Sequence, residues 1–201
     1  MSALINIVTF NVRQPEDPAY CTDRVVQLLN SITNEADVIC LQGLNPDRFR
    51  TITSALPHFI GFLSSGGAAI AVRKSAFPNP YFRESEGAAV LVLPGGNVYS
   101  VNLNDELVVE EGPGVILGSL HRDLTEEGWK DGMKKVGNFE LSRPANNSPF
   151  WNRVWIRDVK PVSGDVLDFG LWSFKDDAER VTQCIDLCGS THFPMKFSVR
   201  M

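Results

Sequence analysis

The chain opens with an apolar run followed by an apolar stripe at helical spacing. Ile5 to Phe10 is rich in β-branched residues and ends at the polar Asn11, a pattern typical of a buried strand. Apolar residues then recur at helical spacing from Val25 to Ile32. Thr22 or Asp23 can cap this segment, so we expect a helix that begins there.

A second strand and helix follow. Ala36 to Gln42 is again apolar and predicts a buried strand. Asn45 and Pro46 form a capping residue followed by proline at the first helical position. The helix that they open carries Phe49, Ile52 and Leu56 on one face, and Pro57 ends it.

From residue 59 onward the pattern predicts strands joined by turns. Glycine- and proline-rich segments separate the apolar runs, and such segments mark turns. The expected strands are Phe59 to Leu63, Ala68 to Arg73, Ala88 to Leu93, Val98 to Leu103, Val115 to Leu117, Val154 to Val159, Val166 to Trp172 and Lys196 to Val199. The polar stretch from Arg122 to Ser148 is expected to be mostly loop with one short helix. These elements favour an α/β (α+β) fold in which two packed sheets have helices outside.

Length and composition predict one compact domain that covers residues 1–201. The chain has 201 residues, and 43% of them are hydrophobic, which suits a single core. No apolar run reaches the ~18 residues that span a membrane. The first residues lack a basic leader and a small-residue cleavage site, so we expect an intracellular protein without a signal peptide. The net charge of -5 argues against avid non-specific binding of nucleic acid.

The four cysteines are too few and too scattered for a disulfide framework. They are Cys21, Cys40, Cys184 and Cys188. The spacing of Cys184 and Cys188 is a weak metal motif, because structural zinc takes four ligands and no second pair is present. We interpret Cys184 and Cys188 as two helix-spaced thiols packed under a loop.

Polar residues occur at or beside five of the apolar runs. The five segments are Thr9 to Arg13, Asp37 to Gly43, Ile116 to His121, Leu167 to Ser173 and Ser190 to Met195. In this order they resemble the motifs of the endonuclease/exonuclease/phosphatase (DNase I-like) superfamily. The resemblance implies a four-layer α/β/β/α sandwich of two packed mixed sheets. It also implies hydrolysis of phosphate esters with a divalent ion, usually Mg²⁺.

Three positions of the resembling motifs keep the residue that the family uses. Asn11 matches the strand-end Asn beside the metal, and Asp168 and His192 match a carboxylate–imidazole pair in which the Asp orients the His. These three residues are the candidate catalytic residues. Two alternatives stay open: Asn11 could cap the strand end, and His192 could be a hydrogen-bonding residue of the core.

Five positions depart from the family pattern. Gly43 stands where the family has its metal-anchoring Glu, and Ser119 stands where it has the Asp that activates water. His121 replaces the companion Asn, Thr191 replaces the Asp of the last motif, and Asn104 aligns loosely with a family His. Mg²⁺ prefers hard carboxylate oxygens, so these losses predict a degenerate site with no metal ligand set.

Other residues could replace the lost ligands. Acidic residues lie within a few positions of the motifs, at Glu16, Asp17, Asp47 and Asp123. A softer zinc site formed by His121 and His192 is a further alternative.

Two functions follow from this reading. The first is a non-catalytic domain, a pseudoenzyme, that binds protein partners or serves as a structural component of a larger assembly, with no cofactor. The second is a divergent Mg²⁺-dependent phosphodiesterase that acts on nucleic acid or on a phosphorylated head group. Trp129 and the cluster of Phe150, Trp151 and Trp155 are either partner contacts or core residues.

Overall fold

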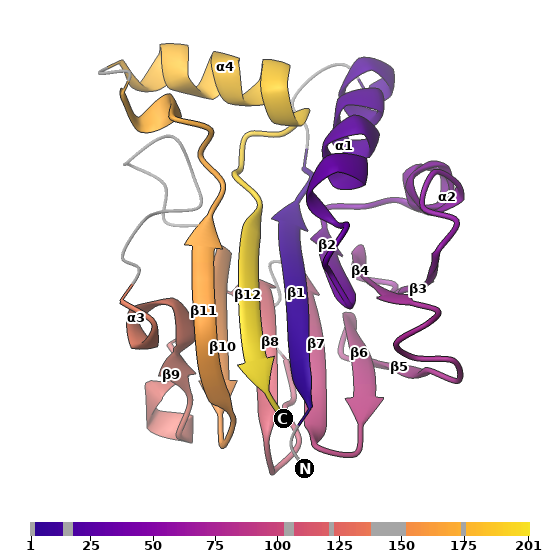
Figure 1. Ribbon diagram of the computed structural model, residues 1–201, viewed down its shortest axis with the longest axis vertical. Helices are drawn as coiled ribbons and strands as arrows, with labels where there is room; N and C mark the ends of the chain where they lie inside the picture. Colours follow the sequence, from indigo (N-terminus) through magenta and orange to yellow (C-terminus); the bar gives the residue numbers. More distant parts are fainter. Residues whose placement is uncertain (1–2, 14–17, 103–106, 121–122, 138–151, 174–175) are drawn as a thin grey trace.

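The structure, a computed structural model, describes residues 3–13, 18–102, 107–120, 123–137, 152–173 and 176–201. Two six-stranded sheets pack face to face (Figure 1). The first sheet has the spatial order β11 (Lys160–Val166), β12 (Met195–Arg200), β1 (Leu4–Asn11), β2 (Val38–Gln42), β4 (Ala68–Arg73) and β3 (Phe59–Leu63). The second has the order β5 (Tyr81–Ser85), β6 (Ala88–Leu93), β7 (Gly96–Asn102), β8 (Gly114–Ser119), β10 (Asn152–Arg157) and β9 (Lys130–Asp131).

Both sheets are mixed. One pair in each sheet runs parallel, β1 with β2 and β7 with β8, and the other pairs are antiparallel. The helices are α1 (Pro18–Ile32), α2 (Pro46–Ser54), α3 (Gly132–Lys135) and α4 (Asp177–Cys188), with 3₁₀ turns at Thr125–Glu127 and Leu171–Ser173. This arrangement confirms the predicted α/β sandwich of two packed mixed sheets. None of the helices in the described ranges is long and apolar enough to cross a membrane.

Alternation along the strands of the second sheet divides the interior into two cores. Val115 and Leu117 of β8 point between the sheets, and Ile116 joins a separate cluster on the other face of the second sheet. Because successive strand residues point to opposite faces, a single strand can serve both cores. Trp129 and Trp155 are 1% and 2% exposed in this second cluster. Their interpretation as core residues is therefore confirmed, and Phe150 and Trp151 lie outside the described residues.

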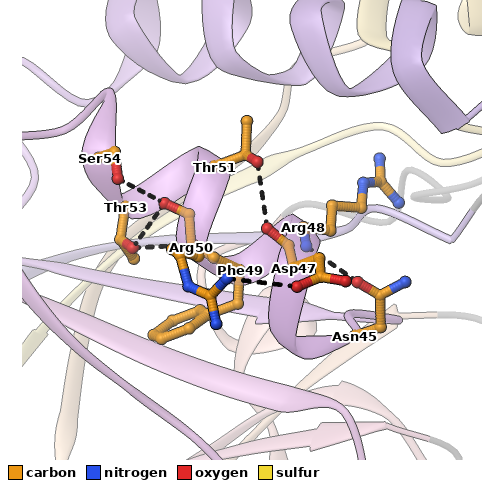
Figure 2. Close-up of polar contacts among 8 residues, drawn as sticks. All are labelled: Asn45, Asp47, Arg48, Phe49, Arg50, Thr51, Thr53 and Ser54. Carbon is orange, nitrogen blue, oxygen red and sulfur yellow. Dashed lines mark hydrogen bonds and ion pairs between the residues drawn. The ribbon is translucent and has the colours of Figure 1, made fainter.

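Helices α1, α2 and α4 pack beside one another, with α1 in contact with both of its neighbours. The sequence explains the start of α2 well: the side chain of Asn45 accepts a hydrogen bond from the backbone N–H of Arg48 at 2.9 Å, and Pro46 takes the first position (Figure 2). Hydroxyl groups further along α2 donate to carbonyls one turn back (Figure 2).

Several predicted boundaries were wrong. Helix α1 begins at Pro18, four residues before the predicted cap at Thr22. The predicted strand from Val166 to Trp172 does not form, because β11 ends at Val166 and a turn follows. In this turn Phe169 has a φ of 54° and Gly170 a φ of 77°, values outside the strand region.

Strands β5, β9 and β11 and helix α4 were not predicted. Helix α4 carries Cys184 and Cys188 on its buried face. All four cysteines are buried as free thiols, and the predicted helical spacing of Cys184 and Cys188 is confirmed because both lie on α4.

Candidate functional site

The positions that resemble the family motifs meet at one end of the sandwich. Asn11 pairs with Gln42 at the ends of the parallel strands β1 and β2, and Asn102 pairs with Ser119 at the ends of β7 and β8. Parallel strands end at the same edge of a sheet, so each sheet gathers two strand ends. Asn11 and Ser119 then join the two sheets directly, because the Nδ2 atom of Asn11 donates to Oγ of Ser119 at 3.1 Å.

We call Asn11, Ser119 and Ser190 the strand-end cluster. The Oγ atom of Ser190 donates to the carbonyl of Asn11 at 2.6 Å, and the Oδ1 atom of Asn11 accepts from the backbone N–H of Arg13 at 3.0 Å. The three residues are 2%, 1% and 0% exposed. Each side chain of the cluster is neutral, so the groups that meet here are amide and hydroxyl dipoles.

A second set of neutral hydrogen bonds lies beside the strand-end cluster. Gln42 is fully buried, and its Nε2 atom donates to Oγ1 of Thr9 at 3.2 Å and to Oγ of Ser100 at 3.0 Å. Ser100 in turn donates to the carbonyl of Leu41 at 3.1 Å. These bonds also join β1 and β2 to β7, so the end of the sandwich is fixed from both sheets.

The backbone conformation at Gly43 and its surroundings suit a residue without a side chain. Its φ is +78°, in the left-handed region that favours glycine. A Cβ atom added there would lie 2.9 Å from Cβ of Arg13 and 3.0 Å from its Cα. Arg13 therefore occupies the space into which a side chain at position 43 would extend on this backbone.

His192 is buried, and it contacts the strand-end cluster through its backbone. Its N–H donates to Oγ of Ser190 at 3.2 Å, and its Nδ1 atom lies 3.2 Å from Oγ1 of Thr191. Asp168 lies in the turn after β11, where its Oδ1 atom accepts the N–H of Gly170 at 3.2 Å. Among the described residues no hydrogen bond or ion pair joins Asp168 to His192. Any chemical role of these two residues stays a prediction.

Two of the four nearby acidic residues, Asp47 and Asp123, lie in the described part of the chain, and both interact with residues close in sequence. The Asp47 side chain is 91% exposed and pairs with Arg50 at 3.4 Å on the surface of α2 (Figure 2). Asp123 accepts hydrogen bonds from the side chain and the backbone of Thr125, and these bonds lower the pKa of its carboxyl group. Glu16, Asp17, Asn104 and His121 lie outside the described residues.

The donors that the structure describes at this end do not by themselves form the ligand set of a magnesium ion. Mg²⁺ requires near-octahedral coordination by hard oxygens, mostly carboxylate and water. Here the amide oxygen of Asn11 already accepts the N–H of Arg13, and Gly43 offers no side chain. In the part of the chain that the structure describes, no group of three or more His, Cys, Asp or Glu side chains could hold a metal ion.

A buried cation that the sequence did not indicate, Arg48, also lies near this end. It is 8% exposed, and its guanidinium donates to Oγ1 of Thr22 at 3.1 Å and to the carbonyl of Val12. Figure 2 shows its side chain directed away from the other polar side chains of α2. Burial lowers the pKa of Arg48 to about 10, against a smaller opposing effect of Cys21. Arg48 lies four residues before the buried Ile52, and this helical spacing could have indicated that both side chains lie on the same face of α2.

The bond between Asn11 and Ser119 gives a measurable prediction. In a double-mutant cycle of Asn11→Ala and Ser119→Ala, we expect the two losses of unfolding free energy to be coupled by about 1 kcal/mol, the usual contribution of a neutral buried hydrogen bond. Urea unfolding of the four proteins measures this coupling. Additive losses would show that the bond contributes nothing to holding the two sheets together.

Comparisons with known proteins place this geometry in a structural class. No protein-family model matches the chain, and no curated protein matches it. An endonuclease/exonuclease/phosphatase from Bacteroides vulgatus is similar over 98% of both chains, with a TM-score of 0.65 and 13% identity. A humanised D. rerio TDP2 is similar over 98% of this chain and 99% of its own, with a TM-score of 0.61 and 19% identity.

A third similar structure is D. rerio TDP2 complexed with a single-strand DNA product. It covers 99% of this chain and 100% of its own, with a TM-score of 0.60 and 16% identity. The chain therefore has the fold of the endonuclease/exonuclease/phosphatase, or DNase I-like, superfamily. The resemblance drawn from the five motifs is confirmed at the level of the fold.

Proposed function

We propose that this domain uses the nuclease scaffold for binding or assembly and does not hydrolyse phosphate esters. The observation that carries the proposal is the close approach of Arg13 to Gly43, which leaves no room for a side chain at the position that matches the family's anchoring carboxylate in sequence. The pairing of Ser119 with Asn11 supports it, because a hydroxyl replaces the second acidic group and is engaged in joining the sheets. The losses are thus accompanied by local packing that suits the new residues.

The partner that we propose is a protein, and the setting is intracellular. A net charge of -5 does not favour the phosphate backbone of nucleic acid. Strands β3 and β5 are the edges of their two sheets, and stacked rings of Phe62 and Phe82, 5.9 Å apart, join them. Along these edges Ile60 is 44% exposed and Tyr81 is 63% exposed. Exposed edge strands with apolar side chains are common sites of protein association.

The test is an assay of phosphodiester and phosphomonoester cleavage with Mg²⁺ and with Mn²⁺, using purified protein and a His192→Ala variant. We expect the two proteins to give the same rate, equal to the background without protein. A metal-dependent rate that the His192→Ala change abolishes would contradict the proposal, because it would show chemistry at the retained positions.

The alternative function is a divergent metal-dependent phosphodiesterase. Two observations favour it: Asn11, Asp168 and His192 are retained, and a similar structure, D. rerio TDP2, is complexed with a DNA product. Such an enzyme would need ligands other than Gly43 and Ser119, since removing a metal and a general base costs several kcal/mol of transition-state stabilisation. The cleavage assay separates the two functions directly.

A further inference from the structure

A cavity of about 490 Å³ opens at the other end of the sandwich from the strand-end cluster. It is lined by the start of β1, whereas Asn11 lies at the other end of this eight-residue strand, about 23 Å away at the usual rise of about 3.3 Å per residue. The β6–β7 turn supplies another wall from the second sheet, and Met201 a third. The cavity is therefore a separate feature of the fold, and it does not depend on the proposed function.

The walls of the cavity are mostly apolar and partly open to solvent. Leu4 is 45% exposed, and Phe77, Leu93 and Met201 are half-buried against the main core. Gly95 keeps two of the walls close together, because a Cβ atom there would lie 2.7 Å from the carbonyl carbon of Met201. Ligand sites of this size are usually apolar with a few placed polar groups.

The side-chain carboxylate of Asp37 lines this apolar space. Its Oδ2 atom accepts the backbone N–H of Asn6 at 2.9 Å, which fixes the orientation of the carboxyl group. Among the described residues no cation forms an ion pair with Asp37. The neighbouring Arg73 donates instead to three carbonyls, those of Thr33, Asn34 and Ala36, at 2.7 to 2.9 Å.

We propose that this cavity binds a small amphiphilic amine, with its ammonium group on Asp37 and its apolar body against Phe77 and Leu93. A half-buried carboxylate without a counter-ion attracts a cation more strongly than a fully solvated one does, because the effective dielectric constant is lower. The apolar walls add the burial of hydrocarbon surface. A neutral molecule of the same shape gains only the second contribution, and an acid is repelled.

The experiment compares two probes of matched shape, 4-phenylbutylamine and 4-phenylbutan-1-ol, by ¹⁵N–¹H NMR titration of the full chain at pH 7. We expect the amine to shift the amide signals of Asp37, Phe77 and Leu93 and to bind about tenfold more tightly than the alcohol, as a charge-assisted hydrogen bond implies. Asp37→Asn should remove this preference but keep weak binding of both probes. Asp165→Asn, a change of an exposed carboxylate on β11, which β12 separates from β1, should leave the preference intact.

Three outcomes would overturn the proposal. The first is equal affinity of amine and alcohol for the unaltered protein. The second is signal shifts centred on residues that do not line the cavity, including the edges β3 and β5, which would indicate a different surface. The third is no shift with either probe at millimolar concentration. Each is read on the unaltered chain, so the result does not depend on whether a variant folds.

Discussion

Replacing Gly43 with glutamate, the residue of the family motif, is expected to lower the free energy of unfolding by about 2–6 kcal/mol. Two causes add. A non-glycine residue at a φ of +78° is strained, and its Cβ atom would lie 2.9 Å from Cβ of Arg13. Arg13 follows Asn11 closely, so moving it disturbs the backbone that orders the strand-end cluster. Urea unfolding of Gly43→Glu measures the loss.

Gly137→Glu is the matched control for this change. Gly137 has a φ of +81°, but nothing lies within 4 Å of an added Cβ atom. The control therefore carries the backbone strain without the contact, and we expect it to lose only about 1–2 kcal/mol. Equal losses at the two positions would mean that Arg13 yields easily and that the site could accept a carboxylate.

The second large effect is expected at Gly118, in β8 next to the strand-end cluster. Gly118→Ala should cost about 4 kcal/mol or more, or prevent folding, because exceptional losses arise where a side chain has no space. The added Cβ atom would lie 2.1 Å from the carbonyl oxygen of Val101 and 3.1 Å from Cγ of Gln42, at a φ of +126°. The parallel pairing of Val101 with Gly118 leaves no room to shift.

Gly112→Ala provides the comparison for Gly118→Ala. Its φ is +109°, and an added Cβ atom there meets nothing within 4 Å. Circular dichroism and urea unfolding of both variants should show a mildly destabilised Gly112→Ala protein beside a severely destabilised Gly118→Ala protein. If both variants were equally stable, the close packing of β7, β8 and Gln42 would not be important for the fold.

The pattern of apolar residues predicted most of the sheet strands, because a strand that is buried on one or both faces has a recognisable apolar pattern in its sequence. Strand β5 was not predicted because it is an edge strand of mixed polarity that follows a proline-rich segment. The predicted strand after Val166 failed for a local reason. Asp168 accepts the N–H of Gly170 two residues on, and such an Asx turn competes with a strand despite the apolar neighbours.

The candidate site was predictable only in part. Residue identity at Gly43 and Ser119 was enough to expect a missing ligand set. The contact of Arg13 with Gly43 and the bond between Asn11 and Ser119 depend on backbone conformation and on sheets that are distant in sequence, and neither is encoded by a local pattern. The start of α1 could have been predicted from the sequence, since proline is favoured at the first helical position and Pro18 occupies that position.

We propose that the neutral strand-end cluster leaves this end of the sandwich without a metal site. The most direct measurement is a titration of the ¹⁵N-labelled protein with paramagnetic Mn²⁺, followed by the linewidths of the amide signals. We predict that the signals of Asn11, Asp168 and His192 broaden no more than those of buried amides elsewhere. Selective, saturable broadening centred on these three residues, reversed by Mg²⁺, would contradict the account.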